Sequence, residues 1–342
     1  MHVGQHNQLC PELRVHGRAM ECVDSDTYLG DVIASDGTNT LNIRKRISKG
    51  NGVISKIVNI LESVSLGEHY FKIALLLRES LLLNAILSSS ESWYGLTQSE
   101  IEELESVDIN LLRRIFEVPH TVPTVSLFLE TGCISIGTLI KCRRLNYLHY
   151  LVNSEETEML SKFFHAQWEN EVTNDWTLEV KKNLEEFEIP QNFEFLKSKS
   201  APAFQILVKK KAREFEFTRL LKLKNTKAKS KMKDIPYAEL RMQKYLELKE
   251  MTARQAKLWF KFRVRMTPFG ENFRGGKQTV MCPFCSMHPD SQADSFHCVE
   301  MRKLVNIQGT YKDIFSENFS PELVKTLVNI FNFREELRKL NS

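Results

Sequence analysis

The most apolar stretch of the chain is residues 71–87, FKIALLLRESLLLNAIL. Its length approaches that of a membrane span, but Lys72, Arg78 and Glu79 would then lie within the bilayer. Each such charge costs about 3 kcal/mol at the centre of a membrane helix. The stretch therefore predicts a helix that is buried in a protein core.

Apolar residues keep near-helical spacing on both sides of this stretch. They are Ile43, Ile47, Ile54, Ile57, Val58 and Leu61 before it, and Ile101, Leu104, Val107, Leu111 and Ile115 after it. Thr97 and Glu100 have the spacing of a capping box at the start of the later helix, and Pro119 and Pro123 end it. A further helix is expected over residues 136–152, so residues 40–152 are predicted to form a helical bundle.

The N-terminal residues have the composition of short strands. Strands are expected at Leu13–His16, Ala19–Val23 and Tyr28–Ala34, with a turn at Asp36-Gly37. An isolated β-hairpin is only marginally stable in water, so this β region is expected to need a packing partner encoded upstream.

One segment carries the basic charge of the chain. The 342 residues are 42% hydrophobic, enough for a substantial core, and the net charge is +4. Residues 197–265 contain 21 Lys+Arg and 6 Asp+Glu, a net charge of +15. Basic side chains that displace counterions supply affinity for phosphate backbones, and aromatic side chains stack on bases. A merely solvated helix face is the alternative interpretation.

Particular residues of this segment are therefore candidates for nucleic-acid binding. Those expected to contact phosphates are Lys209, Lys210, Lys211, Lys222, Lys224, Lys261, Arg263 and Arg265. Trp259 and Phe262 are expected to stack on bases.

The seven cysteines are scattered except for the last three. Cys282 and Cys285 are separated by two residues, a spacing with which two thiolates hold one Zn²⁺, and Cys298 follows. A structural zinc ion held by Cys282, Cys285, Cys298 and Asp294 is predicted. Three residues stay open as the fourth ligand: Asp294, His288 and His297. The alternative is two buried structural cysteines and an unrelated third.

The number and spacing of the cysteines also indicate the cellular compartment. The chain lacks the dense, even framework of a secreted mini-protein, and no N-terminal run has the pattern of a signal peptide. An intracellular location, cytoplasmic or nuclear, is expected, with no membrane partner.

No complete set of catalytic residues can be assembled from the sequence. Asp31 follows Tyr28-Leu29-Gly30, but two-metal phosphoryl transfer needs clustered carboxylates, and Asp31 has no partner on a comparable strand. A structural role is expected for Asp31.

The N-terminal motifs resemble the region after the palm in non-LTR retrotransposon reverse transcriptases, which are RNA-directed DNA polymerases. The resemblance rests on Tyr28-Leu29-Gly30, the flanking segments MHVG (1–4) and IASDG (33–37), and the following helix with Arg44 and Arg46. In that family the Tyr-Leu-Gly strand belongs to the primer-grip hairpin, the next helices form the thumb domain, and a zinc knuckle resembling the three cysteines often follows.

The resemblance implies that the chain is a fragment that binds RNA and RNA–DNA hybrid, with the palm and endonuclease of the same element as upstream partners. The family's catalytic Tyr/Phe-X-Asp-Asp turn is absent, so the chain alone is predicted to be inactive as a polymerase. At the position where the family's zinc knuckle has a histidine, four residues before the last cysteine, this chain has Asp294. A carboxylate oxygen is a weaker zinc ligand than an imidazole nitrogen. The alternative function is a host-adopted protein-interaction module without a nucleic-acid role.

The predicted fold is mainly α and has six parts. These are a β-hairpin region (1–39), a helical thumb-like bundle (40–152), an acidic helical connector (153–196), a basic helical arm (197–265), a zinc knuckle (266–300) and a C-terminal helical tail (301–342).

Overall fold

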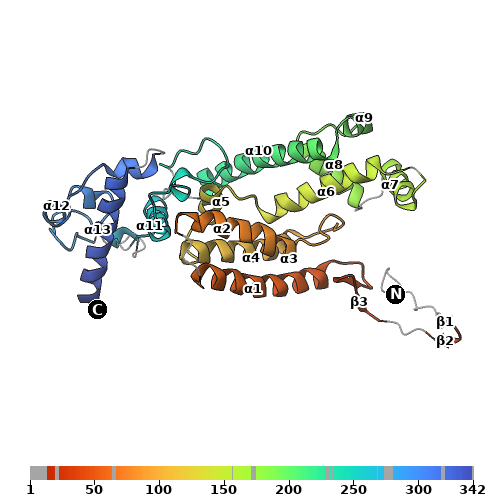
Figure 1. The fold of residues 1–342 in the computed structure, drawn as a ribbon, viewed down its shortest axis with the longest axis horizontal. Coiled ribbons are helices and arrows are strands. Elements are labelled where there is room, and N and C mark those ends of the chain that lie inside the picture. The colour runs from red at the N-terminus through yellow and green to blue at the C-terminus, as the bar shows by residue number, and fades with distance from the viewer. Residues whose placement is uncertain are drawn as a thin grey trace. The chain divides into compact units, whose positions relative to one another are not determined.

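The computed structural model describes residues 14–19, 23–63, 67–155, 157–170, 175–227, 232, 234–267, 269–272, 280–316 and 320–340. Within these ranges the fold is mainly helical with a short N-terminal β region, as predicted (Figure 1). The chain forms two compact units. The first comprises residues 1–57, 77–110 and 134–216, and the second comprises 58–76, 111–133 and 217–342.

The unit boundaries differ from the boundaries of the six predicted parts. Three long helices contribute residues to both units: α1 (Thr40–Ser63), α4 (Gln98–Phe116) and α10 (Ala201–Lys227). A helix is a local pattern, whereas a unit is defined by contacts between distant segments, so helical periodicity alone does not reveal this division.

The β region consists of two hairpins. Strand β1 (Arg14–Val15) pairs with β2 (Arg18–Ala19), and β3 (Ser25–Tyr28) pairs antiparallel with β4 (Asp31–Ala34). The chain reverses at Leu29 and Gly30, whose φ angles of 48° and 95° suit a two-residue hairpin turn. The prediction of one strand over residues 28–34 was therefore wrong, because Gly30 allows a reversal within it. The expected turn at Gly37 is present, with its N–H donating to the Ala34 carbonyl.

The predicted helix over residues 71–87 is a continuous helical run. It comprises α2 (Tyr70–Leu77), a π-helical segment η2 (Arg78–Leu83) and α3 (Asn84–Ile86). The expected capping box of α4 is also present, since Thr97 N donates to Glu100 Oε2 (2.9 Å) and Glu100 N donates to Thr97 Oγ1 (3.2 Å). Local spacing was sufficient for both elements.

The core of the first unit lies between α1, the η2–α3 segment and α4. A Cβ added at Gly50 of α1 would lie 2.6 Å from Ile86 Cγ2, so glycine permits a close helix approach there. The remaining helices of this unit are α6 (Ile136–Asn153), α7 (Met159–Glu169), α8 (Trp176–Glu186) and α9 (Phe193–Lys197), with the N-terminal part of α10.

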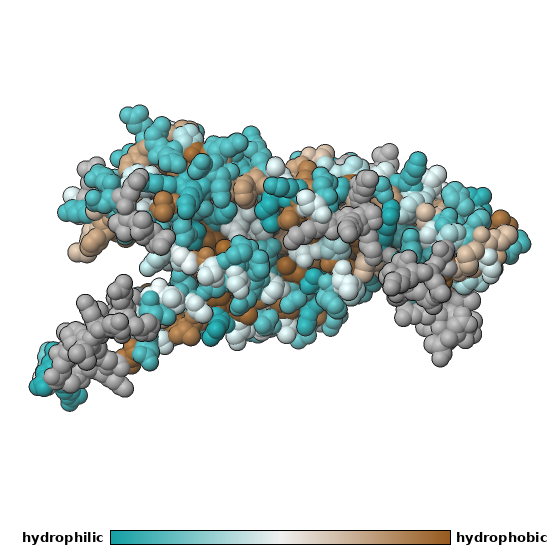
Figure 2. All heavy atoms as spheres, turned by 180° about the vertical axis from the view of Figure 1, so that it is seen from behind, coloured by the Kyte–Doolittle hydropathy of each residue, from teal (hydrophilic) through white to brown (hydrophobic). Residues whose placement is uncertain are grey.

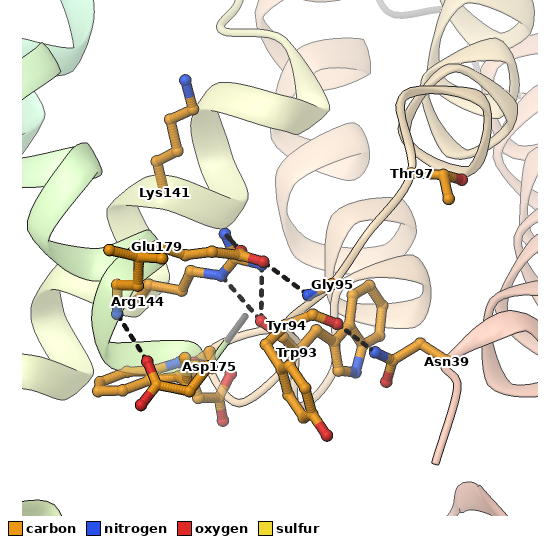
Figure 3. A network of polar contacts seen from close by, with 12 residues as sticks. Asn39, Trp93, Tyr94, Gly95, Thr97, Lys141, Arg144, Asp175 and Glu179 are labelled. Carbon is orange, nitrogen blue, oxygen red and sulfur yellow. Dashed lines mark hydrogen bonds and ion pairs between the residues drawn. The ribbon is translucent and has the colours of Figure 1, made fainter. Parts of the chain in front are cut away.

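A polar network fixes the connection between α3 and α4 within the first unit (Figure 3). Arg144 of α6 donates through Nε and Nη2 to the Trp93 carbonyl and pairs through Nη1 with Glu179 of α8 (2.6 Å). The Gly95 N–H donates to Glu179 (2.6 Å), and the Asn39 amide donates to the Tyr94 carbonyl (2.8 Å). The Trp93 and Tyr94 carbonyls and the Gly95 N–H thus obtain their hydrogen bonds from side chains rather than from regular secondary structure.

The second unit contains α5 (Thr124–Thr131), α11 (Ala253–Arg263), α12 (Val299–Leu304) and α13 (Pro321–Leu340), with α2. Short 3₁₀ segments connect them: η1 (Gly67–His69), η3 (Lys244–Leu246), η4 (Gly270–Asn272), η5 (Asp294–Phe296) and η6 (Tyr311–Phe315). An aromatic cluster joins the elements, since the Phe116 ring lies 5.1 Å from Phe71 and 4.2 Å from Phe260 between centroids. The predicted C-terminal helix is confirmed as α13.

Apolar side chains are mostly internal. In the face drawn in Figure 2, hydrophilic residues dominate and hydrophobic residues are scattered among them. Within the described residues no single helix combines the length and the apolar composition of a membrane span, although α5 and α6 meet those criteria together as a bent pair.

Candidate metal centre and basic surfaces

A tight hairpin brings the first two candidate metal ligands together. Asp290 N donates to the Val280 carbonyl, and Cys282 N donates to the His288 carbonyl (2.7 Å). The chain reverses between them, with Ser286 N bonded to the Cys282 carbonyl and Ser286 at a φ of 54°. This left-handed residue lets the backbone fold back beside Cys285.

The third cysteine comes from the start of α12. Cys298 is the N-cap residue of this helix, where its sulfur accepts from Met301 N. The sulfurs of Cys282, Cys285 and Cys298 all lie within 4.8 Å of one another, and the Cys282–Cys298 separation is 3.8 Å. Bonds of about 2.3 Å in a tetrahedron place sulfurs roughly 3.8 Å apart. The three cysteines could therefore hold one metal ion, as their spacing predicted.

The surroundings favour a thiolate at one cysteine more than at another. Backbone N–H groups of Met287 and His288 donate to the sulfur of Cys285 and lower the pKa of this thiol. Burial raises the pKa of Cys298 to about 11. A bound cation would favour the thiolate form of Cys298, since the charge of a metal ion outweighs the cost of burial.

The structure brings together three of the four predicted ligands, and Asp294 is not among them. Among the described residues the cluster contains the three cysteines, and Asp294, His288 and His297 lie outside it. Asp294 instead accepts from Ser291 Oγ (2.6 Å) while its own N–H donates to Ser291 Oγ (3.0 Å). In this reciprocal cap at the start of η5, the carboxylate of Asp294 is hydrogen-bonded to Ser291.

Three residues predicted to contact nucleic acid lie in the protein core. Trp259, Phe262 and Arg263 are 2%, 0% and 2% exposed. Arg263 Nε donates to Glu130 (3.0 Å), and its Nη1 donates to the Ile314 carbonyl. The predictions that Trp259 and Phe262 stack on bases and that Arg263 contacts phosphate are therefore wrong, because these side chains form the inward face of α11.

Other predicted basic residues are bound by the protein itself. Lys224 is buried and donates to the Ile235 carbonyl (2.7 Å), so the prediction that Lys224 contacts phosphate is also wrong. Arg265 pairs with Asp234 (2.6 Å), and Lys211 pairs with Glu188 (2.9 Å). Lys261 is half-buried. Lys209, Lys210 and Lys222 are exposed on α10 and remain candidates for phosphate contact.

A basic face on α1 was not recognised from the sequence. Arg44, Lys45, Lys49 and Lys56 are exposed on this helix. Residues 40–61 contain five Lys+Arg and no Asp or Glu, a signal that was available without the structure. We refer to Arg44, Lys45, Lys49 and Lys56 as the α1 basic face.

The β3–β4 hairpin packs on the N-terminal part of α1. Asp31 accepts from Asn42 Nδ2 (3.1 Å) and Arg46 Nη2 (2.5 Å), and Val32 N donates to Asn42 Oδ1. Burial raises the pKa of Asp31, but hydrogen bonds from Ser89, Arg46 and Asn42 together lower it by more. The pKa of Asp31 therefore lies below its ordinary value. These contacts agree with the structural role expected for Asp31.

The Tyr28-Leu29-Gly30 motif forms the tip of this hairpin. Tyr28 is the last residue of β3, and Leu29 and Gly30 make the turn. The Leu29 side chain is 88% exposed. Lys45 of the α1 basic face donates to Thr27 Oγ1 of the same hairpin (3.4 Å), so the hairpin contacts the basic face at this residue.

No family model, curated protein or solved structure matches this chain.

Proposed function

We propose that the chain is the nucleic-acid-holding C-terminal part of a non-LTR retrotransposon reverse transcriptase. In this proposal it binds RNA or an RNA–DNA hybrid through the α1 basic face and the adjoining β3–β4 hairpin. The observation that carries the proposal is a long exposed helix face with basic residues and no acidic residue over 40–61.

The geometry of this face suits a phosphate backbone. Lys45, Lys49 and Lys56 lie on one side of α1, because offsets of four and eleven residues return to nearly the same direction on a helix. At 1.5 Å per residue they span about 16 Å, the length of about five phosphates along one strand. Arg46 does not belong to the face, since it pairs with Asp31 and is buried.

Zinc is the ion we assign to the cysteine cluster. Three thiolates close to one another are soft ligands that favour Zn²⁺ over magnesium or calcium. The ion would be structural, because it would join the 280–290 hairpin to the start of α12 in a segment with few regular elements.

The binding proposal can be tested with the full chain and fluorescently labelled RNA or RNA–DNA hybrid across a salt series. We expect the logarithm of the binding constant to fall linearly with the logarithm of salt concentration. A variant with Lys45, Lys49 and Lys56 each changed to Gln should bind more weakly at low salt. Its salt slope should be shallower by about 2 to 3, since each phosphate contact contributes about 0.7 to 0.9.

The matched control removes the same number of exposed positive charges from the second unit, with Lys303, Lys312 and Lys325 each changed to Gln. This control should bind like the unchanged chain. Equal binding by the α1 variant and the control would contradict the role of the α1 basic face. No binding at low salt by the unchanged, folded chain would favour the protein-interaction alternative.

A further inference from the structure

A pocket of about 690 Å³ lies between α11 and α13 in the second unit. One wall carries basic side chains of α11, namely Arg254, Lys257 and Lys261, and the other carries Val328, Phe331 and Asn332 of α13. The size lies within the range of small-molecule sites, about 300 to 1,000 Å³.

The basic wall holds more positive charge than its neighbours neutralise. Arg254, Lys257 and Lys261 are spaced by three and four residues and therefore share one face of α11. Among the described lining residues Glu117 is the one acid, and it accepts from Lys257 Nζ (2.7 Å). Lys257 also lies over the Tyr70 ring, 4.2 Å from its centroid. Within the part of the chain that the structure describes, Arg254 and Lys261 have no acceptor.

Lys261 is placed where an anion would be favourable. Its side chain is half-buried, and this burial lowers the pKa of Lys261 below its ordinary value. The charge of Lys257 acts in the same direction, whereas the nearby carboxylates of Glu117 and Glu335 oppose the shift without accepting a hydrogen bond from Lys261. A partly desolvated ammonium without an acceptor gains a charge-assisted hydrogen bond when an anion binds.

The α13 wall suits a flat apolar group. Val328 and Phe331 are half-buried, and Leu258 of α11 adds to the apolar lining. Asn332, at the edge, offers both an amide donor and an acceptor. A simple anion would use the basic wall alone, whereas a phosphorylated nucleoside would use both walls.

We infer that this pocket binds a nucleotide, with its phosphate at Arg254 and Lys261 and its base against Val328 and Phe331. The ligand chemistry is a phosphorylated nucleoside, either free or as one unit of single-stranded RNA. The inference goes beyond the proposed function, because it concerns residues of the second unit and does not require the α1 basic face.

Calorimetry of the full chain with adenosine monophosphate, adenosine and inorganic phosphate tests this inference. Adenosine monophosphate should bind at least about tenfold more tightly than adenosine or phosphate, since only it reaches both walls. A variant with Arg254→Gln and Lys261→Gln should lose about tenfold or more in affinity for adenosine monophosphate and keep its affinity for adenosine. Phe331→Leu should weaken both.

Two controls separate binding from folding. Lys325→Gln removes an exposed charge from α13 outside the pocket lining and should change nothing. Lys261→Arg keeps the charge and should retain binding. Phosphate binding as tight as that of the nucleotide, or nucleotide binding unchanged in the double variant, would overturn the inference.

A competition experiment with single-stranded RNA distinguishes a free nucleotide from one unit of an RNA strand. Displacement of adenosine monophosphate by single-stranded RNA, weakened by the double variant, supports a unit of a strand. Absence of displacement supports a free nucleotide. The α1 variant should bind adenosine monophosphate normally, so failure of the proposed function and failure of this inference give different results.

Discussion

Arg78 and Asp108 form a buried ion pair, with side chains 3% and 0% exposed. Arg78 donates through Nε and Nη2 to both carboxylate oxygens (2.6 Å each), and Nη2 also donates to the Ile134 carbonyl (3.1 Å). Burial of either charge alone would be costly, so the two partners depend on each other.

Removing one partner of this pair should destabilise the chain strongly. Asp108→Ala leaves the Arg78 guanidinium uncompensated and should lower the free energy of unfolding by about 3 to 5 kcal/mol. Urea denaturation measures the change. Glu300→Ala, which breaks the exposed pair with Lys303, should cost less than about 1 kcal/mol. Similar losses in the two variants would show that the burial of the Arg78–Asp108 pair has no energetic consequence.

A second buried group explains why Arg263 is not at the surface. Glu130 is fully buried and accepts from Tyr237 Oη (2.5 Å) and from Arg263 Nε. Burial raises the pKa of Tyr237 well above its ordinary value, and the nearby charge of Glu130 adds to this effect. Tyr237 therefore stays protonated and donates to Glu130.

At the scale of elements, one carboxylate joins the starts of two helices. Glu100 closes the capping box of α4 with Thr97 and also accepts from Thr40 Oγ1 at the first residue of α1 (2.8 Å). Burial raises the pKa of Glu100, but hydrogen bonds from the Thr97 backbone and from the Thr40 and Thr97 hydroxyls together lower it by more. The pKa of Glu100 therefore lies below its ordinary value of 4.5.

This lowered pKa gives a stability effect with a defined sign. The contribution of Glu100 is present above pH 4.5 and is lost as the pH falls through the pKa of the folded state. Glu100→Ala should cost about 1 kcal/mol at pH 7, and its difference from the unchanged chain should shrink below pH 4.5. Thermal or urea unfolding over pH measures this effect.

Two variants on the same helix test the assignment to the cap. Glu100→Gln keeps a capping partner without the charge and should lose the pH-dependent part alone. Glu103→Ala removes an exposed carboxylate and should change little. A cost at pH 7 that persists undiminished at low pH would contradict the contribution of the ionised carboxylate.

At the scale of the whole molecule, the segment that carries the three clustered cysteines is fixed within the second unit by side-chain contacts. Gln292 donates to the Phe262 carbonyl of α11 and accepts from Thr267 Oγ1 (2.7 Å each). Asp290 accepts from Arg334 of α13 (2.7 Å) and from Gly270 N. Changes in the cysteine cluster should therefore be transmitted to neighbouring elements of this unit.

The effect of losing the metal should stay within the second unit. The unchanged chain should contain one zinc per chain by elemental mass spectrometry, and Cys285→Ser should lose it while Cys142→Ser retains it. Hydrogen exchange in Cys285→Ser should rise over residues 280–305, and α6 and α8 of the first unit should keep their protection. Retention of zinc by Cys285→Ser would refute the site, and an equal rise in α6 would refute the local effect.

Much of the fold follows from local sequence. The helices over residues 40–63, 98–116, 136–153 and 321–340 carry apolar residues at helical spacing, and the Thr97–Glu100 cap is set by a three-residue offset. The spacing of Cys282 and Cys285 likewise indicated a shared site. These features depend on neighbours within one or two turns of chain.

Tertiary structure alone decided which charged residues point inward and which segments share a unit. Arg263 and Glu130 are 133 residues apart in the chain. The local sequence of a basic segment is identical whether its arginine faces solvent or a buried carboxylate. Only the structure shows that Asp294, which the spacing suggested as a metal ligand, is hydrogen-bonded to Ser291. Local periodicity determines the faces of an element, but the partner that each face meets is selected by contacts between segments distant in the chain, because burial and pairing energies belong to the assembled core.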